Sequence, residues 1–262
     1  MYRSKYSTLA GQNQTRSQRA VDVTAPRVSS SPTNRVLGSL ARGDWEMLEP
    51  HLEPVTLKFR QRLETANRRI GTVCFIDSGL ASVVALGGSE RRRAEIGIIG
   101  REGMTGVAVI LGVDHSPYET IVQIEGHGRC IGASQLRGLM GKNPALAAGL
   151  LRYAHIFAVQ AGHTALANAQ GKIEERLARW LLMGHDRLEG DELHLTHEFL
   201  SIMLGVRRAG VTTALHQLEK LALISTTRGC VTVLDRHGLE ESANGLYGVP
   251  EAEFERLFPN NS

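Results

Sequence analysis

Hydrophobic and polar positions alternate in the first half of the chain, a pattern typical of β-strands. Val55, Leu57, Phe59 and Leu63 fall on odd positions with polar residues between most of them, which is a period of two. Further short apolar runs are separated by turn residues: 72–76, 80–86, 93–99, 121–125 and 129–131. Gly87-Gly88-Ser89 lies between two of these runs and predicts a hairpin turn. Short strands at this spacing predict an antiparallel roll or barrel, preceded by a short amphipathic helix over 37–48.

The pattern changes at Asn143-Pro144, where Asn is a good N-cap and Pro suits the first helical position. Apolar residues then recur at helical spacing: Leu146, Leu150, Tyr153, Phe157 and Ala161. Gly149, Gly162 and several alanines give parts of this helix surface small side chains or none, so that another helix could approach closely. Two interpretations follow: a core helix of one chain, or a helix that packs against its copy in a dimer.

Gly171 is expected to end the long helix, and a second helix follows, outlined by Ile173, Leu177, Trp180, Leu181 and Gly184. Residues 195–215 then fit a helix-turn-helix. Core residues stand where the two helices must touch: Leu200, Leu204, Val206, Val211 and Ala214. Ser201 provides the small residue at the helix crossing, and Gly205 provides the turn, where a left-handed backbone favours glycine.

A β-hairpin follows the helix-turn-helix, with strands over 224–226 and 231–234 and a turn at Thr227-Arg228-Gly229. This order predicts a winged helix, with Arg228 at the wing tip near phosphate. The second helix, about 207–221, would enter the major groove with its N-terminal residues towards the bases. Arg207 and Arg208 are therefore the candidate base-contacting residues, because a guanidinium can donate two hydrogen bonds to guanine; they could also be solvated surface arginines.

Four further residues are candidate DNA contacts. Thr212 and Thr213, one turn later, could contact a phosphate or a thymine methyl group, and Thr196 and His197 lie where the first helix starts near the DNA backbone. Gly210 inside the second helix is explained either by close approach to DNA or by tight packing.

Charge does not by itself indicate nucleic-acid binding. The 262 residues carry a formal charge of +3, and residues 190–238 contain five basic and five acidic side chains. Bulk charge is therefore excluded as the source of affinity, which would come from dimerisation and from clustered arginines. The composition, 42% hydrophobic and 22% charged, is that of a soluble globular protein, and with no apolar run long enough for a membrane helix we expect a cytoplasmic protein and no membrane partner.

The N-terminal 35 residues are polar and rich in arginine. They fit a disordered tail, a basic arm that touches DNA, or an upstream start-codon misassignment.

The cysteines and histidines indicate no metal or redox centre. Cys74, Cys130 and Cys230 are far apart in sequence, so we expect neither disulfide stapling nor an iron–sulfur cluster. Cys74 and Cys130 are interpreted as small buried hydrophobes, with a haem or redox role as the alternative. His194 and His197, with His185 nearby, are weak evidence for a metal site. No nucleophile–base pair stands out, so we do not expect an enzyme.

Taken together, the roll, the long helix and the winged helix, which ends in the run VTVLDRHGL (231–239), resemble the Crp/Fnr family of bacterial transcription regulators. The resemblance covers about 36–243 and is most specific in the helix-turn-helix and in IGIIGREGMTG (96–106). It implies an α+β fold with an N-terminal antiparallel β-roll of cyclic-nucleotide-binding type, a long dimerisation helix and a C-terminal winged helix-turn-helix. The implied domains are a disordered tail (1–35), a sensor (36–143), a dimerisation helix (144–170), a DNA-binding domain (171–245) and a C-terminal tail (246–262).

The resemblance also implies homodimers that bind double-stranded operator DNA, with RNA polymerase as a further candidate partner. Arg208 falls on the family's base-contacting arginine. Ala209 replaces the neighbouring acidic residue, which implies a different operator sequence.

The effector site departs from the family pattern. The family glycine matches Gly103, but Met104 stands in place of the glutamate that binds the ribose hydroxyl. The arginine that binds the cyclic phosphate is missing, and Glu119 in that region would repel a phosphate. The candidate effector pocket therefore comprises Gly103, Met104, Thr105, Tyr118 and Glu119, and we expect no cyclic-nucleotide cofactor. The alternative function is a ligand-binding sensor or adaptor whose winged helix contacts protein.

Overall fold

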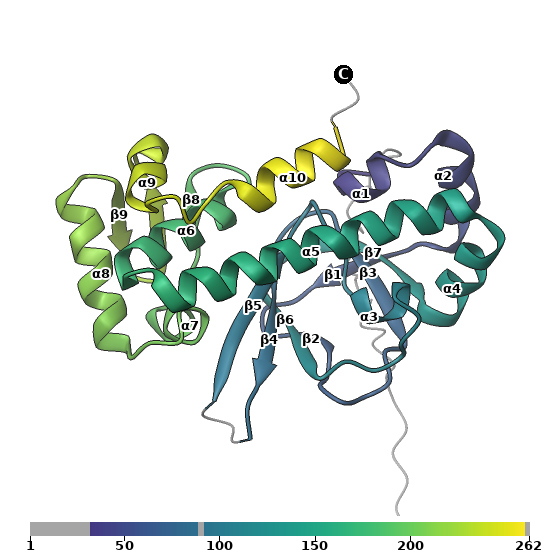
Figure 1. The fold of residues 1–262 in the computed structure, drawn as a ribbon, viewed down its shortest axis with the longest axis horizontal. Coiled ribbons are helices and arrows are strands. Elements are labelled where there is room, and N and C mark those ends of the chain that lie inside the picture. The colour runs from purple at the N-terminus through teal and green to yellow at the C-terminus, as the bar shows by residue number, and fades with distance from the viewer. Residues whose placement is uncertain (1–31, 89–91, 260–262) are drawn as a thin grey trace, which may run out of the picture.

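The computed structural model describes residues 32–88 and 92–259, and it confirms the expected α+β fold (Figure 1). Two antiparallel sheets form the N-terminal roll. One has the order β1-β7-β3 and the other β2-β6-β4-β5. Their strands are β1 Glu53–Leu57, β2 Arg62–Glu64, β3 Thr72–Ile76, β4 Leu80–Leu86, β5 Arg93–Ile99, β6 Tyr118–Ile124 and β7 Gly126–Gly132. Four helices flank the roll: α1 Arg35–Gly38, α2 Arg42–Leu48, α3 Val107–Ile110 and α4 Ala133–Lys142.

Two expected elements are each divided in the structure. The single strand expected over 55–63 is two strands, β1 and β2, because the chain turns between them at Arg60, whose φ is 62°. This turn leaves Phe59 exposed, although its odd position suggested burial. The single helix expected over 37–48 is α1 and α2. The alternation of polar and apolar residues continues through the turn between β1 and β2, so this pattern alone could not reveal the turn.

The long helix α5 spans Pro144–Gln170 and begins as the sequence predicts (Figure 1). The Asn143 side chain accepts hydrogen bonds from the backbone N–H groups of Ala145 and Leu146, and Pro144 occupies the first position. Gly171 ends the helix. The predicted apolar stripe packs on the roll, because Leu146, Leu150, Tyr153 and Phe157 are all buried.

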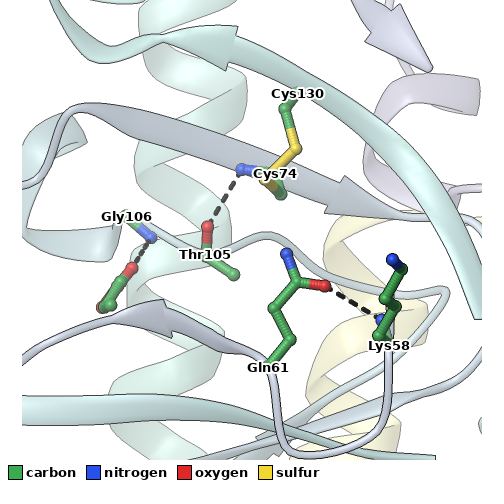
Figure 2. The surroundings of a disulfide bond; sticks show 7 residues. Lys58, Gln61, Cys74, Thr105, Gly106 and Cys130 are labelled. Carbon is green, nitrogen blue, oxygen red and sulfur yellow. Dashed lines mark hydrogen bonds between the residues drawn. A yellow bond between two sulfur atoms is a disulfide. The ribbon is translucent and has the colours of Figure 1, made fainter. Parts of the chain in front are cut away.

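The cysteine prediction is wrong for two of the three residues. Strands β3 and β7 place Cys74 directly opposite Cys130, with their Cα atoms 4.0 Å apart, and the two form a disulfide (Figure 2). The sulfur-bearing side chains are buried, as expected. Sequence spacing could not show the pairing, because it depends on the register between two strands that lie 56 residues apart.

The C-terminal part begins with helix α6 (Ile173–His185) and contains the predicted helices α7 (His197–Met203) and α8 (Arg208–Lys220). The wing strands are β9 (Ile224–Thr227) and β10 (Cys230–Val233). A short strand that the sequence did not reveal, β8 (Glu192–Leu193), completes a sheet of order β8-β10-β9. Helix α9 (Arg236–Ser242) follows. One hydrophobic core joins this part to Leu80, Val84 and Ile98 of the roll.

The expected C-terminal tail, 246–262, contains a helix instead. Helix α10 (Val249–Leu257) runs back along α5 towards α1 (Figure 1). It buries Phe254 against the roll-side core and pairs Glu255 with Arg35. Its sequence was missed because only nine residues are helical and their apolar positions are few. The expected tail at 1–35 lies mostly outside the described residues. No helix of the described chain is long and apolar enough to span a membrane.

Candidate nucleic-acid interface

The helix-turn-helix has the geometry that its sequence predicts. Leu200, Leu204, Val211 and Ala214 are each at most 3% exposed, which confirms them as its core. The chain leaves α7 through Gly205, whose φ of 61° is left-handed, a conformation that costs a residue with a side chain about 1 kcal/mol or more. The backbone N–H of Val206 then donates to the Ser201 carbonyl, closing the turn.

Arg207 and Arg208 lie side by side at the start of α8. Arg207 is the N-cap residue, Arg208 is the first residue of the helix, and both are exposed. Among the described residues, neither guanidinium makes a hydrogen bond or an ion pair. Their donors are therefore available to a molecule that approaches this end of the helix.

Three other candidate residues lie beside these arginines. The Thr212 hydroxyl lies 3.3 Å from His197 Nδ1, which brings the start of α7 against the first turns of α8. Thr196 caps α7, because its side-chain oxygen accepts a hydrogen bond from the Phe199 backbone N–H. These contacts form one surface from residues distant in sequence.

Thr213 is exposed, and its hydroxyl donates to the Ala209 carbonyl in the preceding turn. Its methyl group and oxygen both remain on the surface of α8. Gly210 faces the other way: a Cβ there would lie 3.3 Å from Ile173 Cδ1. Tight packing against α6 therefore accounts for this glycine.

The wing is held against α8 by Glu219. Its carboxylate accepts hydrogen bonds from the Thr226 backbone N–H at 2.9 Å and from the Thr226 hydroxyl. These hydrogen bonds, mainly that from the hydroxyl, hold the pKa of Glu219 below its usual value. At the wing tip Arg228 is exposed, precedes Gly229 with its φ of 79°, and has no partner in the described chain.

Sequence reasoning missed the C-terminal half of the exposed face of α8. His216, Gln217 and Lys220 are exposed there, on the same side of the helix as Thr213. The signal that could have found them is the recurrence of polar residues every three to four positions after Arg208. Gln217 makes no side-chain hydrogen bond within the described residues, whereas His216 contacts Glu219.

Three of the candidate effector residues, Gly103, Met104 and Thr105, lie in the packed interior of the roll. Met104 is fully buried and pairs with Phe75 in an isolated bridge, and Gly103 lies directly against the Tyr153 hydroxyl. The Thr105 hydroxyl accepts a hydrogen bond from the Cys74 backbone N–H (Figure 2). None of the five lines any of the three cavities described for residues 32–88 and 92–259.

Tyr118 and Glu119 lie on strand β6, whose Thr120 shares the Glu64 carboxylate with the backbone N–H of Gly106. Tyr118 is 37% exposed. The Glu119 carboxylate is 2.8 Å from Arg93 Nη2 and 3.7 Å from Arg62 Nε. The negative charge that was expected to repel a phosphate is therefore already paired with two arginines.

The histidines near the helix-turn-helix do not converge. His185 contacts Asp191, whereas His197 contacts Thr212. No cluster of three or more metal-ligating side chains occurs in the part of the chain that the structure describes.

Comparison with known proteins places the C-terminal part within a family. Residues 175–242 match the family model of the Crp-like helix-turn-helix domain. No curated protein is similar enough to count as a match.

Many solved structures match over most of the chain. FixK2 from Bradyrhizobium japonicum has a TM-score of 0.62 and 16% identity, covering 76% of this chain and 98% of its own. TTHB099, a CRP-family transcriptional regulator from Thermus thermophilus, has a TM-score of 0.60 and 18% identity, covering 73% and 97%. The c-di-GMP-responsive global regulator CLP of Xanthomonas campestris has a TM-score of 0.57 and 18% identity, covering 74% and 99%. The chain therefore carries a Crp-like helix-turn-helix domain and has the fold of the Crp/Fnr family transcription regulators.

Proposed function

We propose that the chain is a homodimeric, sequence-specific transcription regulator that binds double-stranded operator DNA in the cytoplasm. The observation that carries the proposal is the pair of exposed, unpartnered guanidinium groups of Arg207 and Arg208 at the start of α8, as the described residues place them. In a helix-turn-helix this end of the second helix enters the major groove. Arg208 would contact guanine O6 and N7, and Arg207 would contact the same edge or a neighbouring phosphate.

The surrounding residues fit contacts to the DNA backbone. Thr196, His197 and Thr212 surround the start of α7, where the first helix would cross a phosphate strand. Arg228 at the wing tip would reach a phosphate on the other side, and Thr213 would lie along the groove. Phosphate contacts fix the position of the protein without reading sequence.

Dimerisation through α5 is supported by the face that α5 leaves uncovered. Six residues on it are exposed, and most are small: Ala148, Leu151, Ala158, Gly162, Ala165 and Ala169. With His155, which contacts Glu253 of α10, they follow one another at spacings of three and four. This heptad spacing is that of a helix pair that packs closely. Both interpretations of the α5 sequence would then hold. One face of the helix packs in the core of its own chain, and the other would contact the second copy.

We further propose that the effector site has lost the family's ligand. Met104 takes the place of the ribose-binding glutamate and is part of the core, and Glu119, the acid in the phosphate region, is paired with arginines. A cyclic nucleotide would find neither of its usual partners.

The test begins with selection of genomic fragments bound by the full chain, followed by titration of a selected operator and of a scrambled duplex. Arg208→Ala should lower the affinity for the operator about 10-fold or more, as expected for one bidentate base contact, and change non-specific binding far less. Arg68→Ala is the control, since Arg68 is an exposed arginine of the roll without an ion pair within the described chain. Full operator discrimination by the Arg208 variant would refute the assignment.

Salt dependence separates this function from the sensor or adaptor alternative. DNA binding through several phosphates must weaken steeply as salt rises. A winged helix that only contacts protein would show no such operator binding at any salt concentration.

A further inference from the structure

A cavity of about 530 Å³ lies between the roll, the long helix α5 and the C-terminal part of the chain. Its walls come from the loop after β5, from α5, from the end of α6, and from α9 and α10. Helix α10, which provides part of the wall, lies along α5 (Figure 1). A volume of this size is typical of small-molecule sites. The cavity contains none of the candidate effector residues and none of the candidate DNA contacts.

One wall of the cavity is apolar. It is formed by Ile156 and Phe157 of α5 and by Pro250 and Phe254 of α10. Phe254 and Ile156 are each 4% exposed, so this wall is fixed by the core behind it. An occupant should therefore have an apolar part.

The polar side of the cavity is built around a buried ion pair. Arg187 Nε lies 2.7 Å from Glu102 Oε1, and Arg187 also donates to the Met183 carbonyl. Arg187 is 6% exposed and Glu102 is 9% exposed. Burying a charge is costly unless it is paired, so this pair is a fixed part of the wall. Arg187 pairs with Oε1 of Glu102, whereas Glu102 Oε2 is buried without a hydrogen-bond partner among the described residues.

Most of the other charges in the wall are also paired. Asp186 contacts Arg236 at 2.8 Å and accepts a hydrogen bond from the Tyr247 hydroxyl at 2.7 Å. Glu255 contacts Arg35 at 2.8 Å at the rim. These groups have no net charge left to offer an occupant.

Two charged residues in the wall, Arg101 and Glu251, make no direct ion pair among the residues that the structure describes, although Arg179 and Arg187 attract Glu251 from a greater distance. Arg101 donates one hydrogen bond, from Nη2 to the Asp186 carbonyl, and meets no carboxylate. Glu251 accepts one hydrogen bond, from the Gly248 backbone N–H to Oε2, and its Oε1 is buried without a donor. One positively and one negatively charged residue without a direct ion pair therefore line a cavity with an apolar wall.

We infer that this cavity binds a small zwitterion with an apolar body, the chemistry of a free amino acid with a hydrophobic side chain. The carboxylate of the ligand pairs with Arg101, its ammonium group pairs with Glu251, and its side chain packs on Phe157 and Phe254. A ligand with only one of the two charges would leave the other residue unpaired, which costs free energy in a partly dry site. The inference does not depend on DNA binding.

The test is calorimetric titration of the full chain, without DNA, using L-phenylalanine and L-leucine as probes. The comparison compounds are 3-phenylpropionate, which lacks the ammonium group, and phenethylamine, which lacks the carboxylate. We expect saturable binding of at least one amino acid, with each comparison compound at least 10-fold weaker than phenylalanine. If neither amino acid binds, or if a comparison compound binds as tightly as phenylalanine, the inference is wrong.

Two variants test the residues. Arg101→Gln should weaken binding of the amino acid at least 10-fold. Glu251→Gln should do the same while leaving the affinity for 3-phenylpropionate unchanged, a result that general unfolding would not give. The matched controls, Arg68→Gln and Glu189→Gln, change exposed charges without ion pairs in the described chain and should bind as the unmodified protein does. Thermal unfolding of each variant checks its fold, and unchanged binding by both cavity variants would overturn the inference.

Discussion

At the scale of single residues, the most consequential buried group is Glu95 on β5. Its carboxylate accepts hydrogen bonds from Ser82 of β4 at 2.5 Å and from Trp180 of α6 at 2.7 Å. The Ser82 hydroxyl also lies 3.4 Å from the sulfur of Met203, on α7. Glu95 therefore links the roll to the DNA-binding part through one polar contact inside the shared core.

Because Glu95 is buried, the stability of the folded protein should depend on pH. Burial raises the pKa of Glu95 to about 7, although the hydrogen bonds from Ser82 and Trp180 oppose the rise. The folded protein then holds a proton that the unfolded chain releases above about pH 4.5, so stability falls as pH rises from 4.5 to 7. At 1.36 kcal/mol per pKa unit the loss is about 3 kcal/mol.

The measurement is urea unfolding at pH 5 and pH 8, followed by tryptophan fluorescence. Glu95→Gln is neutral at both pH values and should lose about 2 to 3 kcal/mol less stability between them than the unmodified protein. Equal losses in the two proteins would show that Glu95 does not carry the effect.

At the scale of elements, the disulfide ties two strands whose pairing already holds the three-stranded sheet together. Strand β7 lies between β1 and β3, and Cys74 faces Cys130 across the β3–β7 ladder (Figure 2). The Cys74 backbone N–H donates to the Thr105 hydroxyl, and the Thr105 backbone N–H donates to the Cys74 carbonyl. The loop before α3 is therefore held to β3 beside the disulfide. Disulfides are uncommon in reducing compartments, and both thiols would stay adjacent there because the ladder holds them.

Reduction of the disulfide should lower the free energy of unfolding by an amount that grows with the logarithm of the length of the loop that the bond closes. For a sequence separation of 56 residues the chain-entropy model gives about 4 kcal/mol. We expect urea unfolding in a phosphine reductant to show a loss of this order. The double variant Cys74→Ala, Cys130→Ala should be insensitive to the reductant, whereas Cys230→Ala should remain sensitive because Cys230 is a free cysteine. A Cys230 variant that lost its sensitivity would contradict the assignment.

The elements also show how far sequence patterns reach. Local signals located α5 through Asn143, Pro144 and Gly171, and the helix-turn-helix through its core positions and Gly205, because each acts within a few residues. The Cys74–Cys130 pairing, the cavity beneath α10 and the pairing of Glu119 with Arg62 and Arg93 depend on register and packing between distant segments. Arg207 and Arg208 could be proposed as DNA contacts from the sequence. Only the structure could show that their guanidinium groups have no partner in the described chain.

At the scale of the whole molecule, the uncovered face of α5 predicts the oligomeric state. Ala158 and Gly162 lie at the middle of this face, and a glutamate at position 158 in both copies would place two like charges in a closely packed seam. We expect Ala158→Glu to yield monomers in analytical ultracentrifugation, with an unchanged far-ultraviolet spectrum, because the side chain is exposed in one chain.

The same variant should bind operator DNA at least 100-fold more weakly. Residues 190–238 of one copy carry as many acidic as basic side chains, so under the proposed function the affinity depends on both copies. Ala252→Glu, which changes an exposed alanine of α10 instead, should remain dimeric. A dimeric Ala158→Glu protein would place the contact between copies elsewhere on the surface.

The return of α10 along α5 has a genetic consequence. A stop codon just after residue 246 would leave every candidate DNA contact in the translated product. It would still remove the helix that pairs Glu255 with Arg35 and places Phe254 in the core beside α5. We expect such an allele to lose function although it encodes the complete helix-turn-helix. A shortened protein designed to end after the helix-turn-helix domain would therefore lack a helix that the fold requires.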